Sequence, residues 1–394
     1  MSAALLNRRT LLKTAACSAP LFTAGKLYAA PASGPRVLVV FLRGAYDAAN
    51  IVVPVSSDFY YASRPNIAIA KDAVLPLDSD WGLHPALKDS ILPLWQAKEI
   101  AFIPFTGTDD TSRSHFETQD TIELGQPVGG SRNYQSGFMS RTAQVLSGTK
   151  PISFTTQLPL TFRGGAPVPN IALNFTGKPA VAERNAALIQ AMYKGQDLAP
   201  AVAQGFEVQN EVYNTFSSEM MAANRNAVTT RGFELSAQRI GVLMQDKFNL
   251  GFVDVGGWDT HVNQGGAQGY LSNRIGELGR GLAALKTALG PKWSDTLVVV
   301  VSEFGRTFRE NGNRGTDHGH GSTYWVLGGA VKGGRIAGPQ TQVTQANLFQ
   351  DRDWPVLTDY RALIGGLLRK GYDLNQTQLA QIFPQAAPAD LALV

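Results

Sequence analysis

Short apolar runs separate the chain into segments that alternate between strand and helix patterns. Residues 36–42, 100–105, 250–255 and 296–301 are continuous runs rich in β-branched and other apolar residues. Such runs are typical of strands that are buried on both faces of a parallel sheet. Residues 324–327 form a shorter fifth run, which we interpret in the same way.

The spacing of apolar residues between these runs predicts helices. The predicted helices cover residues 114–124, 180–193, 208–245, 270–288 and 359–370, with Thr358 as the N-cap of the last. Strands that alternate with helices indicate an α/β fold, and we expect a doubly wound, mostly parallel sheet flanked by helices.

We expect residues 33–394 to form a single domain with an insertion or cap around residues 126–250. The first part of that region, residues 126–180, is rich in Gly, Pro, Ser and Thr. The chain contains no run of 18 apolar residues, so we expect no transmembrane segment.

The N-terminal segment has the pattern of an export signal. Arg8 and Arg9 precede a mildly apolar stretch at residues 14–24 and a small-x-small end at residues 30–32. The paired arginines resemble the twin-arginine motif. We therefore expect the twin-arginine translocase to export the protein and residues 1–32 to be removed, with cleavage after Ala32 or Ala30. The mature protein would be periplasmic or secreted.

Removal of this segment changes the charge and the cysteine content. The whole chain carries a formal charge of +4, but residues 1–32 hold four basic residues and no acidic one, which leaves 31 of each sign. A neutral balance gives no reason to expect nucleic acid as a partner. The single cysteine, Cys17, lies in the same segment. The mature chain therefore has no disulfide, thiolate metal ligand or cysteine nucleophile.

Polar side chains follow the four longest predicted strands. Ligands of open α/β sheets bind at the carboxyl ends of the strands, so we expect these side chains to form one site. The candidates are Asp47, Arg113, Ser114, His115, Asp259, His261, Glu303, Arg306, Asp317, His318 and His320. The remaining histidine, His84, lies between apolar residues, and we interpret it as structural.

The types of these residues indicate metal and anion chemistry. Asp259 and His261 lie on one side of an extended loop, because alternate residues share a face. The segment 317–320 offers three potential ligands in four residues. Ser114 lies at a predicted helix start, where it either helps to stabilise an anion or is a simple N-cap. Arginines near the site could clamp an oxyanion or form ion pairs.

Six motifs in a fixed order resemble those of a large bacterial family. They are Arg43-Gly-Ala-Tyr-Asp47, Gly82-Leu-His-Pro-Ala86, Arg113-Ser-His-Phe116, Asp259-Thr-His261, Ser302-Glu-Phe-Gly-Arg-Thr307 and Gly315-Thr-Asp-His-Gly-His-Gly321. Over about residues 36–390 the chain resembles the family called domain of unknown function 1501, whose members often carry twin-arginine signals. This family looks like a branch of the alkaline phosphatase and sulfatase superfamily.

The resemblance implies an alkaline phosphatase-like core with one or two divalent metals, which could be Zn, Mn, Fe, Mg or Ca. It matches Ser114 to the nucleophile at a helix start. At the fourth strand this chain has Glu303 and Phe304 where the superfamily usually has Asp-His or Asp-Asn, and Phe304 cannot bind metal. The expected metal ligands are Asp47, Asp259, His261, Glu303, Asp317, His318 and His320.

Three functional hypotheses follow. The first is an exported, metal-dependent hydrolase of phosphate or sulfate esters that acts on a small anionic substrate. In it Ser114 attacks, Arg113 or Arg306 neutralises the ester oxygens, and His115 assists proton transfer. The second is a non-catalytic exported binding protein of the same fold. The third is a serine hydrolase without metal.

Overall fold

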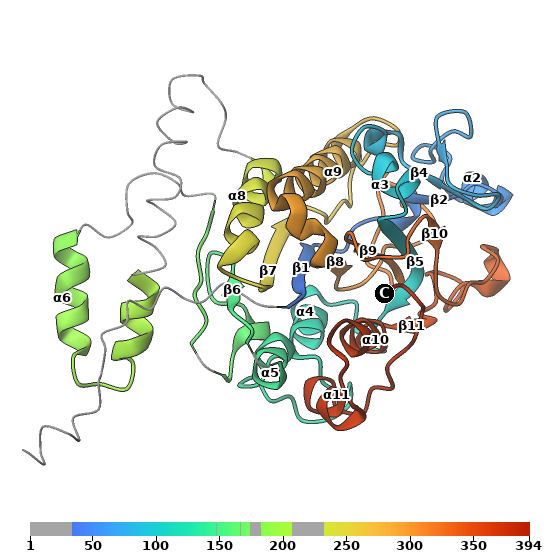
Figure 1. Ribbon diagram of the computed structural model, residues 1–394. Helices are drawn as coiled ribbons and strands as arrows, with labels where there is room; N and C mark the ends of the chain where they lie inside the picture. The colour runs from blue at the N-terminus through green and yellow to red at the C-terminus, as the bar shows by residue number, and fades with distance from the viewer. Residues whose placement is uncertain (1–33, 147, 166, 174–182, 207–231) are drawn as a thin grey trace, which may run out of the picture. The chain divides into compact units, whose positions relative to one another are not determined.

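The computed structural model describes residues 34–146, 148–165, 167–173, 183–206 and 232–394 (Figure 1). The chain divides into two compact units, residues 1–31 and 32–394. The first unit lies outside the described residues, and so does the expected export signal at residues 1–32. The second unit contains the sheet and helices discussed below.

A central sheet contains eight strands in the order β10-β5-β9-β8-β1-β7-β6, with β11 paired to β5. Strands β1, β7, β8 and β6 are mutually parallel, and β5 is parallel to β10 and β11. The sheet strands are β1 Arg36–Arg43, β5 Ile100–Gly107, β6 Pro151–Ser153, β7 Leu250–Gly256, β8 Thr296–Ser302, β9 Ser322–Leu327, β10 Arg335–Ile336 and β11 Thr358–Asp359. The predicted fold class, α/β with a mostly parallel sheet, is confirmed.

Alternate residues of each strand point to opposite faces of the sheet, and both faces are buried. Along β1, Leu38 and Val40 belong to one hydrophobic cluster, and Val37 and Val39 to the other. The first cluster also contains residues of α8 and α9, and the second contains residues of α5, α10 and α11. Helices therefore cover both faces, as Figure 1 shows.

The direction of β9 differs from the prediction. Residues 324–327 do form a buried strand, but β9 runs antiparallel to both β5 and β8. A parallel strand needs a crossover connection, usually a helix, to return the chain to the opposite edge of the sheet. No helix lies between β8 and β9, and residues 303–321 form a loop. The next strand therefore starts from the edge where β8 ends.

The predicted helices match those observed wherever the structure describes them, apart from one cap. They are α4 His115–Leu124, α6 Glu183–Tyr193, α8 Phe233–Asp246, α9 Tyr270–Leu289 and α10 Tyr360–Tyr372. The predictions at residues 180–182 and 208–231 lie outside the described residues. Thr358 was wrong as a cap, because the Asp359 carboxylate accepts hydrogen bonds from the backbone N–H groups of Arg361 and Ala362.

Smaller elements complete the unit. In the region predicted as an insertion or cap, β6 joins the central sheet and α8 packs against α9. In the described part of the chain, no helix has the length and apolarity needed to cross a membrane. The remaining elements are η1 Ala48–Asn50, β2 Val52–Pro54, α2 Asp58–Ser63, β3 Leu75–Pro76, β4 Trp81–Leu83, η2 Pro85–Leu87, α3 Leu92–Gln96, α5 Phe138–Val145, η3 Leu160–Phe162, η4 Gly290–Asp295, η5 Gln345–Asn347 and α11 Gln376–Ile382.

Candidate metal centre

Three histidines from three different strand ends meet at the carboxyl edge of the sheet. His115 begins α4, His261 follows β7, and His318 lies in the loop after β8. The Nε2 atom of His318 is 3.0 Å from Nε2 of His115 and 3.1 Å from Nε2 of His261. The three imidazole rings therefore turn the same nitrogen toward a common point.

The carboxylate of Asp259 lies at the same point. Its Oδ1 is 2.9 Å from Nε2 of His261 and 3.4 Å from Nε2 of His318, and its Oδ2 is 3.5 Å from Nε2 of His115. Ligand atoms of His115, Asp259 and His318 all lie within 4.8 Å of one another. We call these four residues the His/Asp cluster.

Each imidazole is held from behind through its other nitrogen. Nδ1 of His115 is 2.8 Å from the Glu303 carboxylate, and Nδ1 of His261 is 3.1 Å from that of Asp317. Nδ1 of His318 is 2.9 Å from the backbone carbonyl of Arg113. All three partners are acceptors, so the network assigns the proton of each ring to Nδ1. The Nε2 lone pairs then face one another and the Asp259 carboxylate.

This arrangement fits a divalent metal ion. Three lone pairs and a carboxylate at 2.9–3.5 Å repel one another unless a cation lies between them. Ligands at about 2.0–2.1 Å from a tetrahedral zinc ion are spaced about 3.3 Å apart, close to the separations that His318 and Asp259 make with the other ligands. A metal-bound histidine usually donates its second N–H to a carboxylate or carbonyl, as all three do here.

The surroundings of the cluster shift the pKa values of its ligands in different directions. Burial lowers the pKa of His318. Burial alone would raise the pKa of Asp259, but its hydrogen bond and ion pair with Arg306, at 2.6 Å, outweigh this and lower it. The hydrogen bond to Glu303 raises the pKa of His115. The side chains of His115, His318, His261 and Asp259 are 22, 29, 39 and 43% exposed, so solvent reaches the centre.

Close backbone contacts place the loops of the cluster. A Cβ on Gly315 would lie 2.3 Å from the carbonyl carbon of His261, and one on Gly44 would lie 2.8 Å from the backbone nitrogen of Asp259. Thr316 donates its backbone N–H to the carbonyl of Thr260. The loop after β7 and the loop after β8 therefore touch along their backbones, and this contact brings His261 beside His318.

Glu303, which we expected to bind metal, lies behind His115. Its buried carboxylate accepts hydrogen bonds from the backbone of Gly44 and from Gln119, in addition to His115. Burial would raise the pKa of Glu303, but these hydrogen bonds outweigh it and lower the pKa. Asp317 likewise contacts His261 through Nδ1, at the side of the ring that faces away from the cluster.

Two other expected ligands have different partners. The buried carboxylate of Asp47 accepts hydrogen bonds from Arg64 and Gln264, both at 2.6 Å. His320 packs its ring against Phe349, with the ring centres 4.7 Å apart. Within the described residues, neither Asp47 nor His320 forms a direct hydrogen bond or ion pair with a residue of the His/Asp cluster.

The residues expected to act in catalysis differ in their positions relative to the His/Asp cluster. His115 belongs to the cluster itself, a role that we had not predicted. Ser114 is the N-cap of α4 and accepts a hydrogen bond from the backbone of Glu117. The Arg113 guanidinium binds the Asp353 carboxylate at 2.7 Å, and that of Arg306 binds Asp259.

Phe304 contacts the cluster through its ring, and this contact could not be predicted from the sequence. Its ring packs against the imidazoles of His115 and His318, with centres 5.0 and 5.2 Å away. His84 has a structural position: Nδ1 accepts from the backbone of Ala86 at a helix start, and Nε2 lies 3.1 Å from the carbonyl of Gly266.

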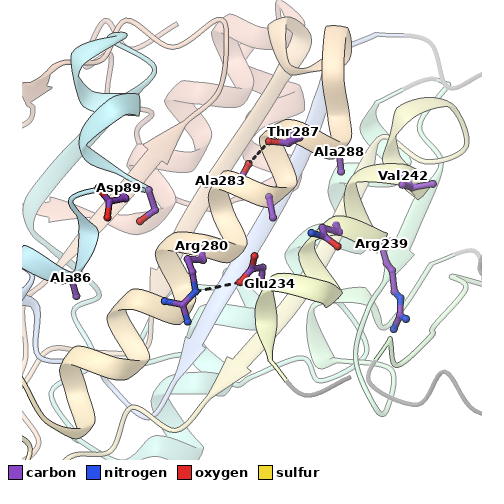
Figure 2. Close-up of a pocket in the computed structure, with 12 residues that line it drawn as sticks. Ala86, Asp89, Glu234, Arg239, Val242, Arg280, Ala283, Thr287 and Ala288 are labelled. Carbon is purple, nitrogen blue, oxygen red and sulfur yellow. Dashed lines mark hydrogen bonds and ion pairs between the residues drawn. The ribbon is translucent and has the colours of Figure 1, made fainter. Parts of the chain in front are cut away.

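A surface pocket lies away from the His/Asp cluster. It is a groove of about 650 Å³ between α8 and α9, lined by residues such as Glu234, Arg280 and Thr287 (Figure 2). Arg280 and Glu234 form an ion pair across it. None of the four cluster residues lines this groove. The chemistry of the described residues is thus concentrated at the sheet edge rather than in the groove.

Comparison with known protein families decides the relationship that the motifs suggested. Residues 34–383 match the family described as "Protein of unknown function (DUF1501)". The chain belongs to this family. A comparison of this DUF1501 protein with curated proteins found no match.

Several solved structures have a low similarity to this chain. A protein in the alkaline phosphatase superfamily from Vibrio parahaemolyticus is 12% identical with a TM-score of 0.38, and the match covers 78% of this chain and 64% of that chain, less than two thirds of its length. BT1596, a 2-O GAG sulfatase, is 9% identical with a TM-score of 0.37 and coverages of 91% and 74%. Alkaline phosphatase from the Antarctic bacterium TAB5 is 14% identical with a TM-score of 0.32 and coverages of 75% and 92%.

Proposed function

We propose that the protein is a metal-dependent hydrolase of phosphate or sulfate esters. The observation that carries this proposal is the convergence of three imidazole Nε2 atoms and one carboxylate, each ring fixed through Nδ1 by an acceptor. Such a set is built to bind a cation in a defined position. Partial exposure lets solvent and a small substrate reach the centre. Because four protein ligands fill a tetrahedral site, catalysis would require the metal to accept the ester oxygen as a fifth ligand.

His115, Asp259, His261 and His318 would hold one divalent metal. Three imidazoles and one carboxylate suit Zn, Mn or Fe better than Ca or Mg, which prefer oxygen ligands. When bound, the metal would act as a Lewis acid that polarises an ester oxygen. The protein's own residues position it: Glu303, Asp317 and the Arg113 carbonyl orient the rings, and Arg306 balances the charge of Asp259.

Ser114 remains our proposed nucleophile. It is partly exposed, opens the ten-residue helix α4, and directly precedes His115 in the chain. At this position its hydroxyl lies at the N-terminal end of α4, where the backbone N–H groups of the first turn and the helix dipole stabilise negative charge. The proposed substrate is a small anionic ester, in keeping with the motif resemblance to phosphatases and sulfatases.

One observation favours a second function, a non-catalytic metal-binding protein. Arg113 and Arg306 were expected to hold the ester oxygens, but both guanidiniums bind carboxylates of the protein. In this second function the centre would bind a metal without turning over an ester. Metal content alone does not distinguish the two functions, whereas ester hydrolysis does.

Metal removal and reloading test the proposed hydrolase. We expect the mature protein to lose aryl phosphate or aryl sulfate hydrolysis on treatment with a chelator and to regain it with Zn²⁺, Mn²⁺ or Fe²⁺ but not with Ca²⁺. The measurements are elemental analysis and release of the aryl alcohol before and after each step. Metal bound without hydrolysis of either ester class would support the binding protein. Absence of both metal and chelator sensitivity would contradict the metal centre.

We also propose that the protein is exported to the periplasm or secreted by the twin-arginine translocase. The support is the order of Arg8 and Arg9, the apolar stretch and the small-x-small end in residues 1–32. We expect the exported protein to start after Ala32 or Ala30. Replacing both arginines with lysine should leave the precursor inside the cell. N-terminal sequencing checks this, and exported protein that starts at Met1 would contradict it.

A further inference from the structure

A chain of buried hydrogen bonds leads from Asp47 to the His/Asp cluster, and Gln264 lies at its middle. The amide nitrogen of Gln264 donates to Asp47 Oδ2 at 2.6 Å. Its amide oxygen accepts from the hydroxyls of Thr260 and Thr316, both at 3.0 Å. All four side chains belong to buried residues. The amide therefore joins two loops to the end of β1 without contact with solvent.

The next step of the chain reaches the cluster. The Thr316 hydroxyl accepts from Nε of Arg306 at 3.2 Å, and Nη1 of Arg306 donates to Asp259 Oδ1 at 2.6 Å. Nη2 of Arg306 also donates to the carbonyl of Thr316. Thr316 thus holds one edge of the guanidinium, and the opposite part of the same group contacts a proposed metal ligand.

The direction of every hydrogen bond in this chain is determined. A carboxylate can only accept, so Gln264 must turn its NH₂ toward Asp47 and its oxygen toward the threonines. A hydroxyl has a single proton, and Thr316 gives it to Gln264. The Thr316 oxygen therefore presents a lone pair to Arg306. Without the acceptor at residue 264, that proton would be released to point elsewhere, including toward Arg306.

A buried ion pair anchors the far end of the chain. Arg64 is fully buried and binds Asp47 through Nη1 at 2.6 Å. The same guanidinium donates to the carbonyls of Phe308 and Thr307, which immediately follow Arg306. The chain therefore closes on itself around the segment that carries Arg306.

We propose that Gln264 is a positioning residue of the metal centre, which holds the Arg306 guanidinium against Asp259 through Thr316. This role rests on the proposed metal centre. Because an ion pair with Arg306 sets both the orientation and the charge of the Asp259 carboxylate, loss of Gln264 should weaken the metal affinity without removing any ligand. A partner that contacts a ligand directly, as Arg306 contacts Asp259, typically contributes about 10–100-fold to affinity, and Gln264 acts on that partner through Thr316.

The test measures the binding of Co²⁺ to the metal-free mature protein. We expect Gln264→Leu to raise the dissociation constant by less than the roughly 10–100-fold that is typical of residues that contact a ligand directly. It should also shift the visible absorption of the bound Co²⁺, because the Asp259 ligand is less well oriented. The control is the variant Leu243→Ala. Leu243 is a buried residue of α8 that takes no part in the hydrogen bonds between Asp47 and Asp259. Leu243→Ala should lower the melting temperature but leave the dissociation constant and the spectrum unchanged.

A second pair of variants keeps the proposal testable if Gln264→Leu does not fold. Thr316→Val removes the hydroxyl with little change in volume, and Thr316→Ser retains it. We expect Thr316→Val to reproduce the weaker Co²⁺ binding and Thr316→Ser to restore it to within a few-fold of the parent.

The outcomes separate this proposal from the metal centre itself. If Gln264→Leu and Thr316→Val bind Co²⁺ as tightly as the parent, with an unchanged spectrum, Gln264 has no positioning role and the metal centre stands. If the parent itself binds no Co²⁺, both proposals are overturned.

Discussion

Replacement of His318 with alanine should abolish the metal binding that we propose for the His/Asp cluster. His318 is the central ring of the cluster, because its Nε2 lies within 3.1 Å of Nε2 of both other histidines. An alanine at this position removes one of the four proposed ligands and leaves only His115, Asp259 and His261 to hold the metal. Even the loss of an outer partner costs about 10–100-fold in affinity, so we expect a loss of more than about 100-fold here. Elemental analysis and Zn²⁺ titration measure this effect.

The chain supplies a matched control two residues away. His320 is also a histidine of the glycine-rich loop, but its ring packs against Phe349 and away from the cluster. His320→Ala should therefore retain its metal, although the loss of a buried ring should lower the melting temperature. Equal metal content in both variants would contradict the assignment of His318. Loss of metal only in His320→Ala would show that the ligand set is drawn wrongly.

The position of the centre could be predicted because it depends on topology. Apolar runs identified β5, β7 and β8, and the carboxyl ends of parallel strands meet at one edge. The segments that follow these three strands carry His115, His261 and His318, and the structure brings all three together. A pattern of strands is therefore enough to indicate which loops share a site.

The sequence does not predict which residues face the centre as ligands and which lie behind them, because this depends on the direction in which each side chain points. Glu303 directly follows β8 and looked like a ligand, yet its carboxylate lies behind His115. Asp47 looked equivalent, but Arg64, from the end of a short helix, neutralises it. No spacing in the sequence links Arg64 to Asp47. Their contact appears only when the loops are packed.

The same reasoning explains the error at β9. Its apolar run predicted burial correctly, since both faces of the sheet are covered. Direction depends instead on the connection, and residues 303–321, which join β8 to β9, contain no helix. A strand that returns directly from the edge where β8 ends must run antiparallel to it.

Replacement of Ser114 with alanine should separate catalysis from metal binding. Ser114 contacts none of the four cluster residues through its side chain in the described structure, so Ser114→Ala should retain the metal. Loss of the attacking hydroxyl should reduce ester hydrolysis by about 1,000-fold or more. The variant also loses a helix cap, worth about 1 kcal/mol, so a small decrease in melting temperature is expected. Metal content, melting temperature and kcat/KM are measured together.

Two controls distinguish the nucleophile from the helix cap. Ser114→Asn keeps a good capping side chain but has no hydroxyl. Its melting temperature should therefore match that of the parent, and its ester hydrolysis should be as low as that of Ser114→Ala. Ser57→Ala removes the comparable cap of α2, which accepts from the backbone of Tyr60, and should keep full activity. If Ser114→Ala hydrolyses the ester within about three-fold of the parent, Ser114 is not the nucleophile. Hydrolysis would then proceed by direct attack of water at a centre that still requires His318.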